Sequence, residues 1–233
     1  MAIFASNGNY LLGVTTQGTV FKADLAARKV ELIEGTTLKA ASLTVSPSGT
    51  TLYVAGDGLT VVDVDHMRVT SKLTTEPDLL EVAASPDDHT VVLRNWHNIE
   101  LFNITGAESG KPAASVIVDP VPNGASISST SRLAFAADGS SLFYIRASGT
   151  GSELISLSTN DLHIEARSTI GAYPNAIAIM PERGWVLVTA GVVGQEQFEA
   201  IDMKTQAVIF KEALAGSSSS YARTSDGCSS NGR

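Results

Sequence analysis

Apolar and polar residues alternate along most of the chain, in short runs separated by turns rich in Pro, Gly, Ser, Asn and Asp. The segment VSPSGTTLYV at 45–54 shows the pattern, with an apolar strand, a tight turn and a second alternating strand. Alternation with a period of two predicts β-strands, and no segment has apolar residues at helical spacing over several turns. The pattern therefore predicts an all-β protein.

This strand, turn and strand unit occurs five times along the chain. The copies begin at Ile3, Val45, Val82, Leu133 and Ile177. The equivalent turn positions are assigned to Gly8, Gly49, Asp88, Gly139 and Arg183, at spacings of 39–51 residues. After each copy comes a third strand that ends in a polar residue, as in LTVVDVDHMR, and most copies add a fourth β-branched run. The period and the strand count are those of β-propeller blades.

We therefore expect a β-propeller of about five four-stranded antiparallel blades in residues 1–215. The repeats are assigned to about 2–38, 39–76, 77–119, 120–171 and 172–215. A β-sandwich also has strands every 8 to 12 residues, but two anchors that recur in a fixed order favour blades. Residues 216–233 are rich in Ser and Gly without apolar spacing, which predicts a disordered tail.

Composition narrows the function classes. The net charge of −8 and the pI near 4.9 argue against a nucleic acid partner. The only cysteine, Cys228, lies near the end of the sequence, so we expect no disulfide framework and no cysteine-based metal site. No segment has the length and hydropathy of a membrane span or a signal peptide. We expect a soluble chain, cytoplasmic by default, although the sequence leaves the compartment unknown.

The segment VSPSGTTLYVAGDGLTVVDVD resembles the YVTN-type β-propeller repeat, a lactonase-like and WD40-like family, and GAYPNAIAIMPERGWVLVTAG at 171–191 resembles the same unit. The resemblance covers roughly residues 2–215. The WD-repeat hallmarks, a Gly-His pair and a terminal Trp-Asp, are missing. Propellers of this type usually have six to eight blades, whereas five are counted here. The resemblance leaves open a compact five-bladed ring and part of a longer propeller.

In a propeller, ligands commonly bind at the face that carries the loops after the second and fourth strands. These loops contain the densest chemical cluster of the sequence, Arg94-Asn95-Trp96-His97, together with Lys39, Glu81 and a long insertion at 119–132. The candidate ligand-binding residues are Asp57, Arg94, Trp96, His97, Arg132, Arg146, Tyr173 and Asn175. With Arg132 and Arg146, the Arg94-Asn95-Trp96-His97 cluster could hold an anionic or sugar-like ligand by charge and stacking. The alternative is structural, with Trp96 anchoring adjacent blades.

No linear catalytic motif and no metal-ligand spacing is present, and we expect no metal and no cofactor. Asp63 and Asp65 in DVDH could suggest a loop for a hard cation, but the rest of that motif is absent, and an Asp that caps the turn after the third strand is the simpler interpretation. The leading hypothesis is a non-enzymatic binding or scaffold propeller that presents a loop face to a protein or small ligand. The resemblance implies a lactonase-like hydrolase as the alternative, with His97 as general base beside Arg94 and Arg146, and part of a longer propeller is a third interpretation.

Overall fold

The described part of the chain contains twenty β-strands and one short 3₁₀ turn. The computed structural model describes residues 1–5, 8–33, 36–73, 79–95, 98–104, 113–117, 133–146, 152–191 and 196–214. The strands form five sheets of four, which we call blades 1 to 5. Blade 1 consists of β1 (Ala2–Phe4), β2 (Tyr10–Val14), β3 (Val20–Asp24) and β4 (Lys29–Ile33). Blade 2 consists of β5 (Ser42–Val45), β6 (Thr51–Gly56), β7 (Gly58–Asp63) and β8 (Arg68–Leu73).

The remaining three blades follow the same order along the chain. Blade 3 consists of β9 (Glu81–Ala84), β10 (Thr90–Arg94), β11 (Asn98–Asn103) and β12 (Ala114–Ile117). Blade 4 consists of β13 (Leu133–Phe135), β14 (Ser141–Arg146), β15 (Glu153–Ser158) and β16 (Ile164–Thr169). Blade 5 consists of β17 (Pro174–Met180), β18 (Trp185–Ala190), β19 (Glu196–Asp202) and β20 (Val208–Leu214), with the 3₁₀ turn η1 (Pro181–Arg183) between β17 and β18.

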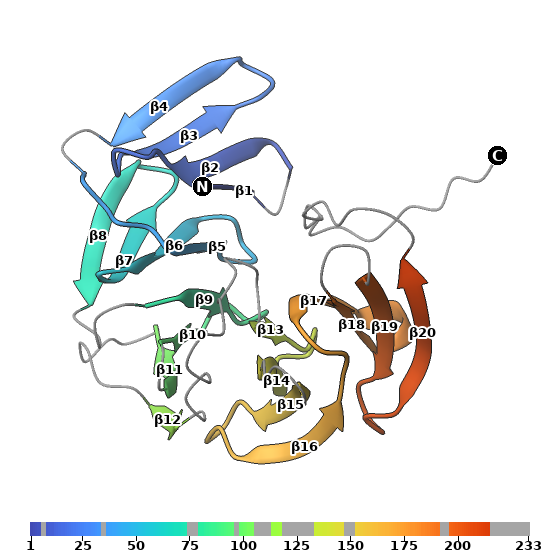
Figure 1. Cartoon of the computed structure of the whole chain (residues 1–233). Coiled ribbons are helices and arrows are strands. Elements are labelled where there is room, and N and C mark those ends of the chain that lie inside the picture. The colour runs from blue at the N-terminus through green and yellow to red at the C-terminus, as the bar shows by residue number, and fades with distance from the viewer. Residues whose placement is uncertain are drawn as a thin grey trace.

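Each blade is an antiparallel sheet whose strands pair in chain order. The blades are arranged around a common centre, with the first strand of each blade innermost and the fourth outermost (Figure 1). The predicted all-β propeller of five four-stranded antiparallel blades is confirmed. Blades 1 and 5 are not adjacent, so the described strands form an open arc (Figure 1).

The turn between the first and second strands explains why similar turn residues recur once in each blade. In blades 1 to 4, the residue that opens the turn donates its backbone N–H to the carbonyl five residues later, as Ser46 does to Thr51 at 2.8 Å. A left-handed residue follows three positions after the first, where glycine is favoured because it has no Cβ. These residues are Gly8, Gly49, Asp88, Gly139 and, in blade 5, Gly184. The assignment of the fifth position to Arg183 is therefore wrong by one residue, because η1 precedes Gly184.

The turn between third and fourth strands depends on an aspartate in three blades. In blade 2, Asp63 Oδ1 accepts the backbone N–H of His66 at 3.0 Å. The same bond joins Asp24 to Ala27 and Asp202 to Thr205, each at 2.7 Å. Of the two aspartates in DVDH, Asp63 therefore caps the turn.

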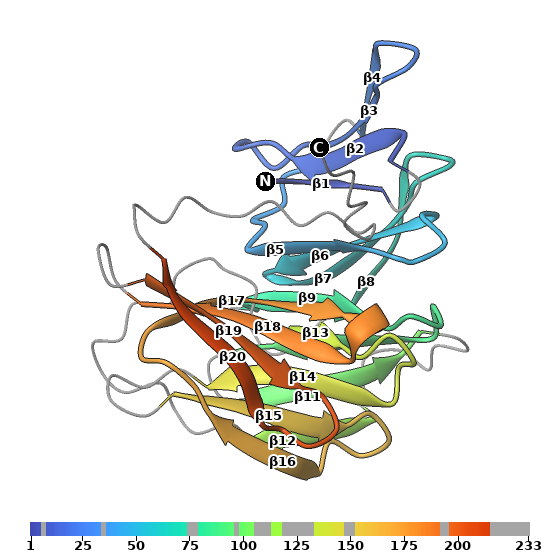
Figure 2. The ribbon, with the colours of Figure 1, turned by 90° about the vertical axis from the view of Figure 1, so that its right-hand side faces the viewer.

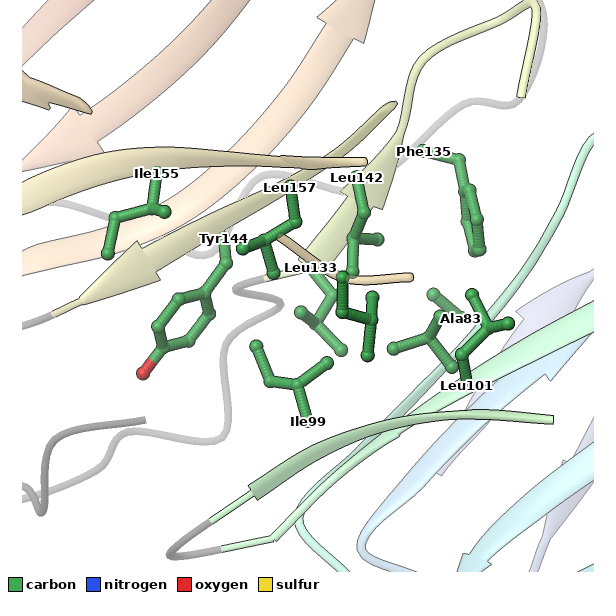
Figure 3. Close-up of a cluster of buried hydrophobic side chains, with 11 residues drawn as sticks. Ala83, Ile99, Leu101, Leu133, Phe135, Leu142, Tyr144, Ile155 and Leu157 are labelled. Carbon is green, nitrogen blue, oxygen red and sulfur yellow. The ribbon is translucent and has the colours of Figure 1, made fainter. Parts of the chain in front are cut away.

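The core lies between blades and not inside any one of them. Four apolar clusters fill the four contacts between successive blades. The cluster between blades 3 and 4 packs Ile99 and Leu101 against Leu133, Leu142 and Tyr144 (Figure 3). Blades 2, 3 and 4 each have a neighbouring blade on both sides. Both of their faces are therefore covered, which is why their strands carry long apolar runs. Within the described ranges, no helix is long and apolar enough to cross a membrane.

Candidate functional site

The candidate site lies at one of the two rims of the arc. Because every blade is antiparallel and begins in the same direction, the connections after second and fourth strands share one rim, which we call the candidate rim. The opposite rim carries the other turns, including η1 (Figure 2). The topology places five of the predicted residues at the candidate rim: Asp57, Arg94, Arg146, Tyr173 and Asn175.

Three of the predicted residues, Trp96, His97 and Arg132, lie outside the described residues, as does the insertion at 119–132. The flanks of the Trp96-His97 pair are described. Asn95 Oδ1 accepts the backbone N–H of Asn98 at 2.7 Å, and the Asn95 N–H reaches the Asn98 carbonyl at 3.1 Å. Asn95 and Asn98 therefore fix the two ends of the tight turn between β10 and β11.

Arg94 is a buried structural cation. It ends β10, directly opposite Glu81 at the start of β9, and only 3% of the residue is exposed. Its Nε lies 3.3 Å from Glu81 Oε2. The other Glu81 oxygen accepts the backbone N–H of Leu133, at 3.0 Å, in the neighbouring blade. Glu81 thus connects Arg94 to blade 4, so Arg94 supports the rim from within.

Arg146 belongs to a second charged cluster, in blade 4. It faces Glu153 across the β14–β15 hairpin, and its guanidinium pairs with that carboxylate. Arg167 on β16 binds the same oxygen of Glu153 at 3.1 Å. Two cations, Arg146 and Arg167, thus share one carboxylate. Glu153 and Arg167 are not among the residues predicted from the sequence, although an Arg that ends one strand and a Glu that begins the next are neighbours in a hairpin.

Asp57 occupies the tip of the tight β6–β7 turn, between Gly56 and Gly58. Its Oδ2 lies 3.3 Å from Lys39 Nζ, and both side chains are largely exposed. A Cβ at residue 56 would collide with the Lys39 carbonyl, so glycine is needed for the close approach of the two segments. An exposed ion pair of this kind contributes little to stability. Because both side chains are exposed, both charges are accessible to a partner.

Tyr173 and Asn175 lie at the start of blade 5. The Tyr173 carbonyl accepts the N–H of Gly191 at 3.0 Å, while Asn175 Nδ2 donates to the Gly191 carbonyl at 3.2 Å. Both residues are thus fixed to the end of the neighbouring strand. Tyr173 has a left-handed backbone with φ 56 and is 54% exposed. The backbone holds an aromatic residue outward at the candidate rim.

Each of these rim residues contacts a neighbour in its own or the adjacent blade: Asp57 contacts Lys39, Arg146 contacts Glu153, and Asn175 contacts Gly191. The rim thus offers separated polar and aromatic groups. Such groups suit contact with an extended partner surface more than chemistry at a single atom. Across the described residues, no three metal-ligating side chains converge.

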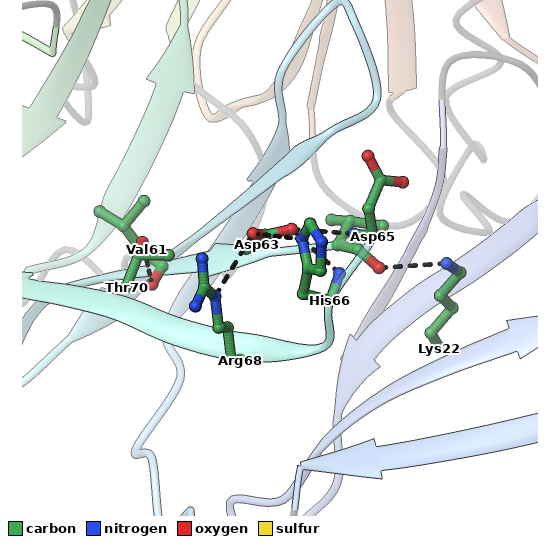
Figure 4. A network of polar contacts seen from close by, with 8 residues as sticks. Lys22, Val61, Asp63, Asp65, His66, Arg68 and Thr70 are labelled. Atoms are coloured by element: carbon green, nitrogen blue, oxygen red, sulfur yellow. Dashed lines mark hydrogen bonds and ion pairs between the residues drawn. The ribbon is translucent and has the colours of Figure 1, made fainter.

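Two other polar features lie away from the candidate rim. The Asp63, His66 and Arg68 network caps the β7–β8 turn, and Lys22 of blade 1 donates to the nearby Val64 carbonyl at 3.0 Å (Figure 4). These contacts join blades 1 and 2. A cavity of about 270 Å³ lies between blades 3 and 4 at the opposite rim, and it is lined by turn residues that include Asp87, Asn103 and Asn160.

No protein-family model and no curated protein sequence matches the chain. Solved structures do match it. Hydrazine synthase of Kuenenia stuttgartiensis is 15% identical with a TM-score of 0.73, and the match covers 92% of this chain and 65% of that chain. The β-propeller domain of Myceliophteria thermophila Cps50 (Swd1) is 16% identical with a TM-score of 0.70, covering 90% and 70%. The chain therefore spans about two thirds of the length of these structures. At such identities the likeness shows the fold alone, and that fold is a β-propeller.

Proposed function

We propose that the chain is a non-enzymatic binding or scaffold propeller that presents the candidate rim to a protein or small ligand. The observation that carries the proposal is the exposed Tyr173, whose backbone carbonyl accepts the N–H of Gly191. Exposed tyrosines are common anchors of binding surfaces because they combine a large apolar ring with a hydroxyl group. The Asp57–Lys39 pair and the Arg146–Glu153–Arg167 cluster add charges of both signs.

The chemistry of the rim favours a protein partner over a small ligand. The exposed groups lie on separate blades, and a small ligand needs an enclosed pocket in which several groups converge. Arg94 is assigned a positioning role in this proposal, because Glu81 already neutralises its charge. The YVTN-type assignment stays a prediction from the sequence, and the lactonase-like alternative depends on His97, which lies outside the described residues.

The test uses a photo-crosslinking amino acid at position 173, with the same group at Lys204 on the opposite rim as the matched control. In lysate, we expect position 173 to form a discrete adduct that mass spectrometry identifies, and position 204 to form none. The Tyr173→Ala change should then weaken binding of the identified partner about tenfold or more, the usual effect of losing an interface anchor. Equal labelling at both positions, or unchanged affinity of the variant, would contradict the proposal.

A second measurement separates binding from catalysis. The chain is incubated with a panel of lactones and esters, with His97→Ala as the comparison. The proposal predicts no turnover above background for either protein. Turnover that the His97→Ala change removes, without lowering the melting temperature, would replace the binding proposal with the hydrolase.

A further inference from the structure

The face of blade 1 that points away from blade 2 is entirely apolar. The strand registers align two rows of side chains across the four strands on this face. The rows are Phe4, Leu11, Ala23 and Val30, and Ala2, Gly13, Phe21 and Leu32. The Phe21 ring covers Gly13, where a Cβ would lie 2.7 Å from two ring carbons. We call these eight residues the free face of blade 1.

The opposite face of blade 1 is built differently. It packs Leu12 and Val20 against blade 2, but its outer part also carries Lys22, Asp24 and Glu31. The polar residues of the blade are thus on the covered side, and the free face has none among its eight positions. Val30 and Leu32 on the free face are 61% and 53% exposed.

Blade 5 exposes a partly apolar face on the side away from blade 4, where the row of Thr189, Phe198 and Glu212 includes two polar residues. A cross-strand row of Ala178, Leu187, Ala200 and Phe210 runs along it. The Phe198 and Phe210 rings lie 6.1 Å apart on this face, and Phe210 is 48% exposed. In Figure 1 the free faces of blades 1 and 5 bound the open part of the arc.

Terminal repeats of a self-contained array normally carry a polar outer face, because the last apolar surface would otherwise be exposed to water. Blade 1 does not follow that rule, and blade 5 follows it only in part, with Thr189 and Glu212 beside its apolar row. The free faces have the composition of the blade contacts inside the arc, where apolar rows from two blades pack together. Another blade is therefore the surface that fits them in both shape and chemistry.

We propose that two further four-stranded β-blades of the same polypeptide pack on the free faces and close a seven-bladed ring. The length of the matching structures supports this number. The chain covers 65% and 70% of those chains. Five blades would be about 71% of a seven-bladed ring, which lies within the four to eight blades typical of propellers. The inference does not depend on the proposed binding function of the rim.

The first test is the intact mass of the native polypeptide, recovered from its own cells with an antibody raised against residues 1–233. We expect a mass above the 24.3 kDa of these residues. The excess should be on the order of 10 kDa, since a blade takes roughly 40–50 residues. A native polypeptide of 24.3 kDa would overturn the proposal.

The second test compares Leu32→Lys with Glu31→Lys, a neighbouring change on the other side of the same strand. In residues 1–233 alone, we expect binding of anilinonaphthalene sulfonate and association without a fixed stoichiometry, both reduced by Leu32→Lys but not by Glu31→Lys. In the native polypeptide Leu32 is covered, so Leu32→Lys should lower the melting temperature by about 5 °C or more.

Two results of the second test would overturn the proposal. A discrete dimer of residues 1–233 that Leu32→Lys dissociates would assign the free face to a second copy of the chain. A monomer that binds no dye would show that the free face is stable in water without any partner.

Discussion

At the scale of single residues, the Glu81–Arg94 pair is the most demanding feature of the structure. Both side chains are nearly fully buried, at 6% and 3% exposure. Burying two charges is costly, and their attraction offsets the cost only when the geometry is good and further hydrogen bonds are made. Glu81 meets this condition because its second oxygen binds the Leu133 N–H of the next blade. The pair therefore ties the alignment of blades 3 and 4 to one carboxylate.

Removal of the Glu81 side chain should lower the free energy of unfolding far more than loss of an exposed ion pair. We expect Glu81→Ala to lower the free energy of unfolding by about 3–5 kcal/mol, because it leaves Arg94 buried without its carboxylate. The double change Glu81→Leu with Arg94→Leu should recover much of the loss, since no charge remains. Urea denaturation gives the values, and Lys29→Ala, at the exposed Lys29–Glu31 pair, should leave the midpoint unchanged. If Glu81→Ala costs no more than Lys29→Ala, the pair has no structural role.

The sequence located Arg94 but not its role. Arg94, Trp96 and His97 look like a chemical cluster because they are close in sequence, whereas the partner of Arg94 lies on another strand. Strand register decides which side chains meet, and a one-residue shift would place Arg94 on the other face of the blade. For Tyr173, in contrast, exposure at the rim followed directly from its place before a first strand.

At the scale of elements, the turns give the blade its fixed form. The turn after the third strand uses an aspartate whose carboxylate accepts backbone N–H groups. The Thr205 N–H holds the pKa of Asp202 below its usual value, and the His66 N–H does the same for Asp63. These short-range bonds are local in sequence, which is why the turns and most strands could be predicted. The misplaced Arg183 shows the limit, because the left-handed position of this turn is the next residue, Gly184.

These aspartates predict how stability depends on pH. A carboxyl group with a lowered pKa in the folded state stabilises it at pH values above the unfolded pKa of about 3.9, and the contribution is lost as pH falls through the folded pKa. We expect the urea midpoint of the wild type to fall steeply below pH 4. Asp63→Asn with Asp202→Asn keeps an oxygen acceptor but removes both titrating groups, so its midpoint should fall less. An equally steep fall in both proteins would contradict this linkage.

At the scale of the whole molecule, the four apolar clusters of the described residues join each blade to its neighbours along the chain. The repeat period was readable from the sequence, because every unit has the same turn signals. The open arc could not be read from the sequence, because ring closure depends on faces contributed by blades far apart in the chain. The free faces of blades 1 and 5 resemble inner faces in composition, so alternation alone cannot distinguish a covered face from an uncovered one.

This nearest-neighbour architecture predicts that protection from hydrogen exchange varies along residues 1–233. Blade 4 packs on both sides and fully buries Leu133, Leu142, Ile145 and Leu154, whereas blade 1 packs on one side only. In a stack of repeats, local opening is easiest where a repeat has a single neighbour. Amide groups of β2 and β3 should therefore exchange faster than those of β14 and β15 in exchange measured by mass spectrometry. Leu142→Ala should cost about 2–5 kcal/mol and speed exchange in blades 3 and 4 together. Equal protection of blades 1 and 4 would mean that the chain opens as one cooperative unit, since blade 1 would then share the stability of the interior.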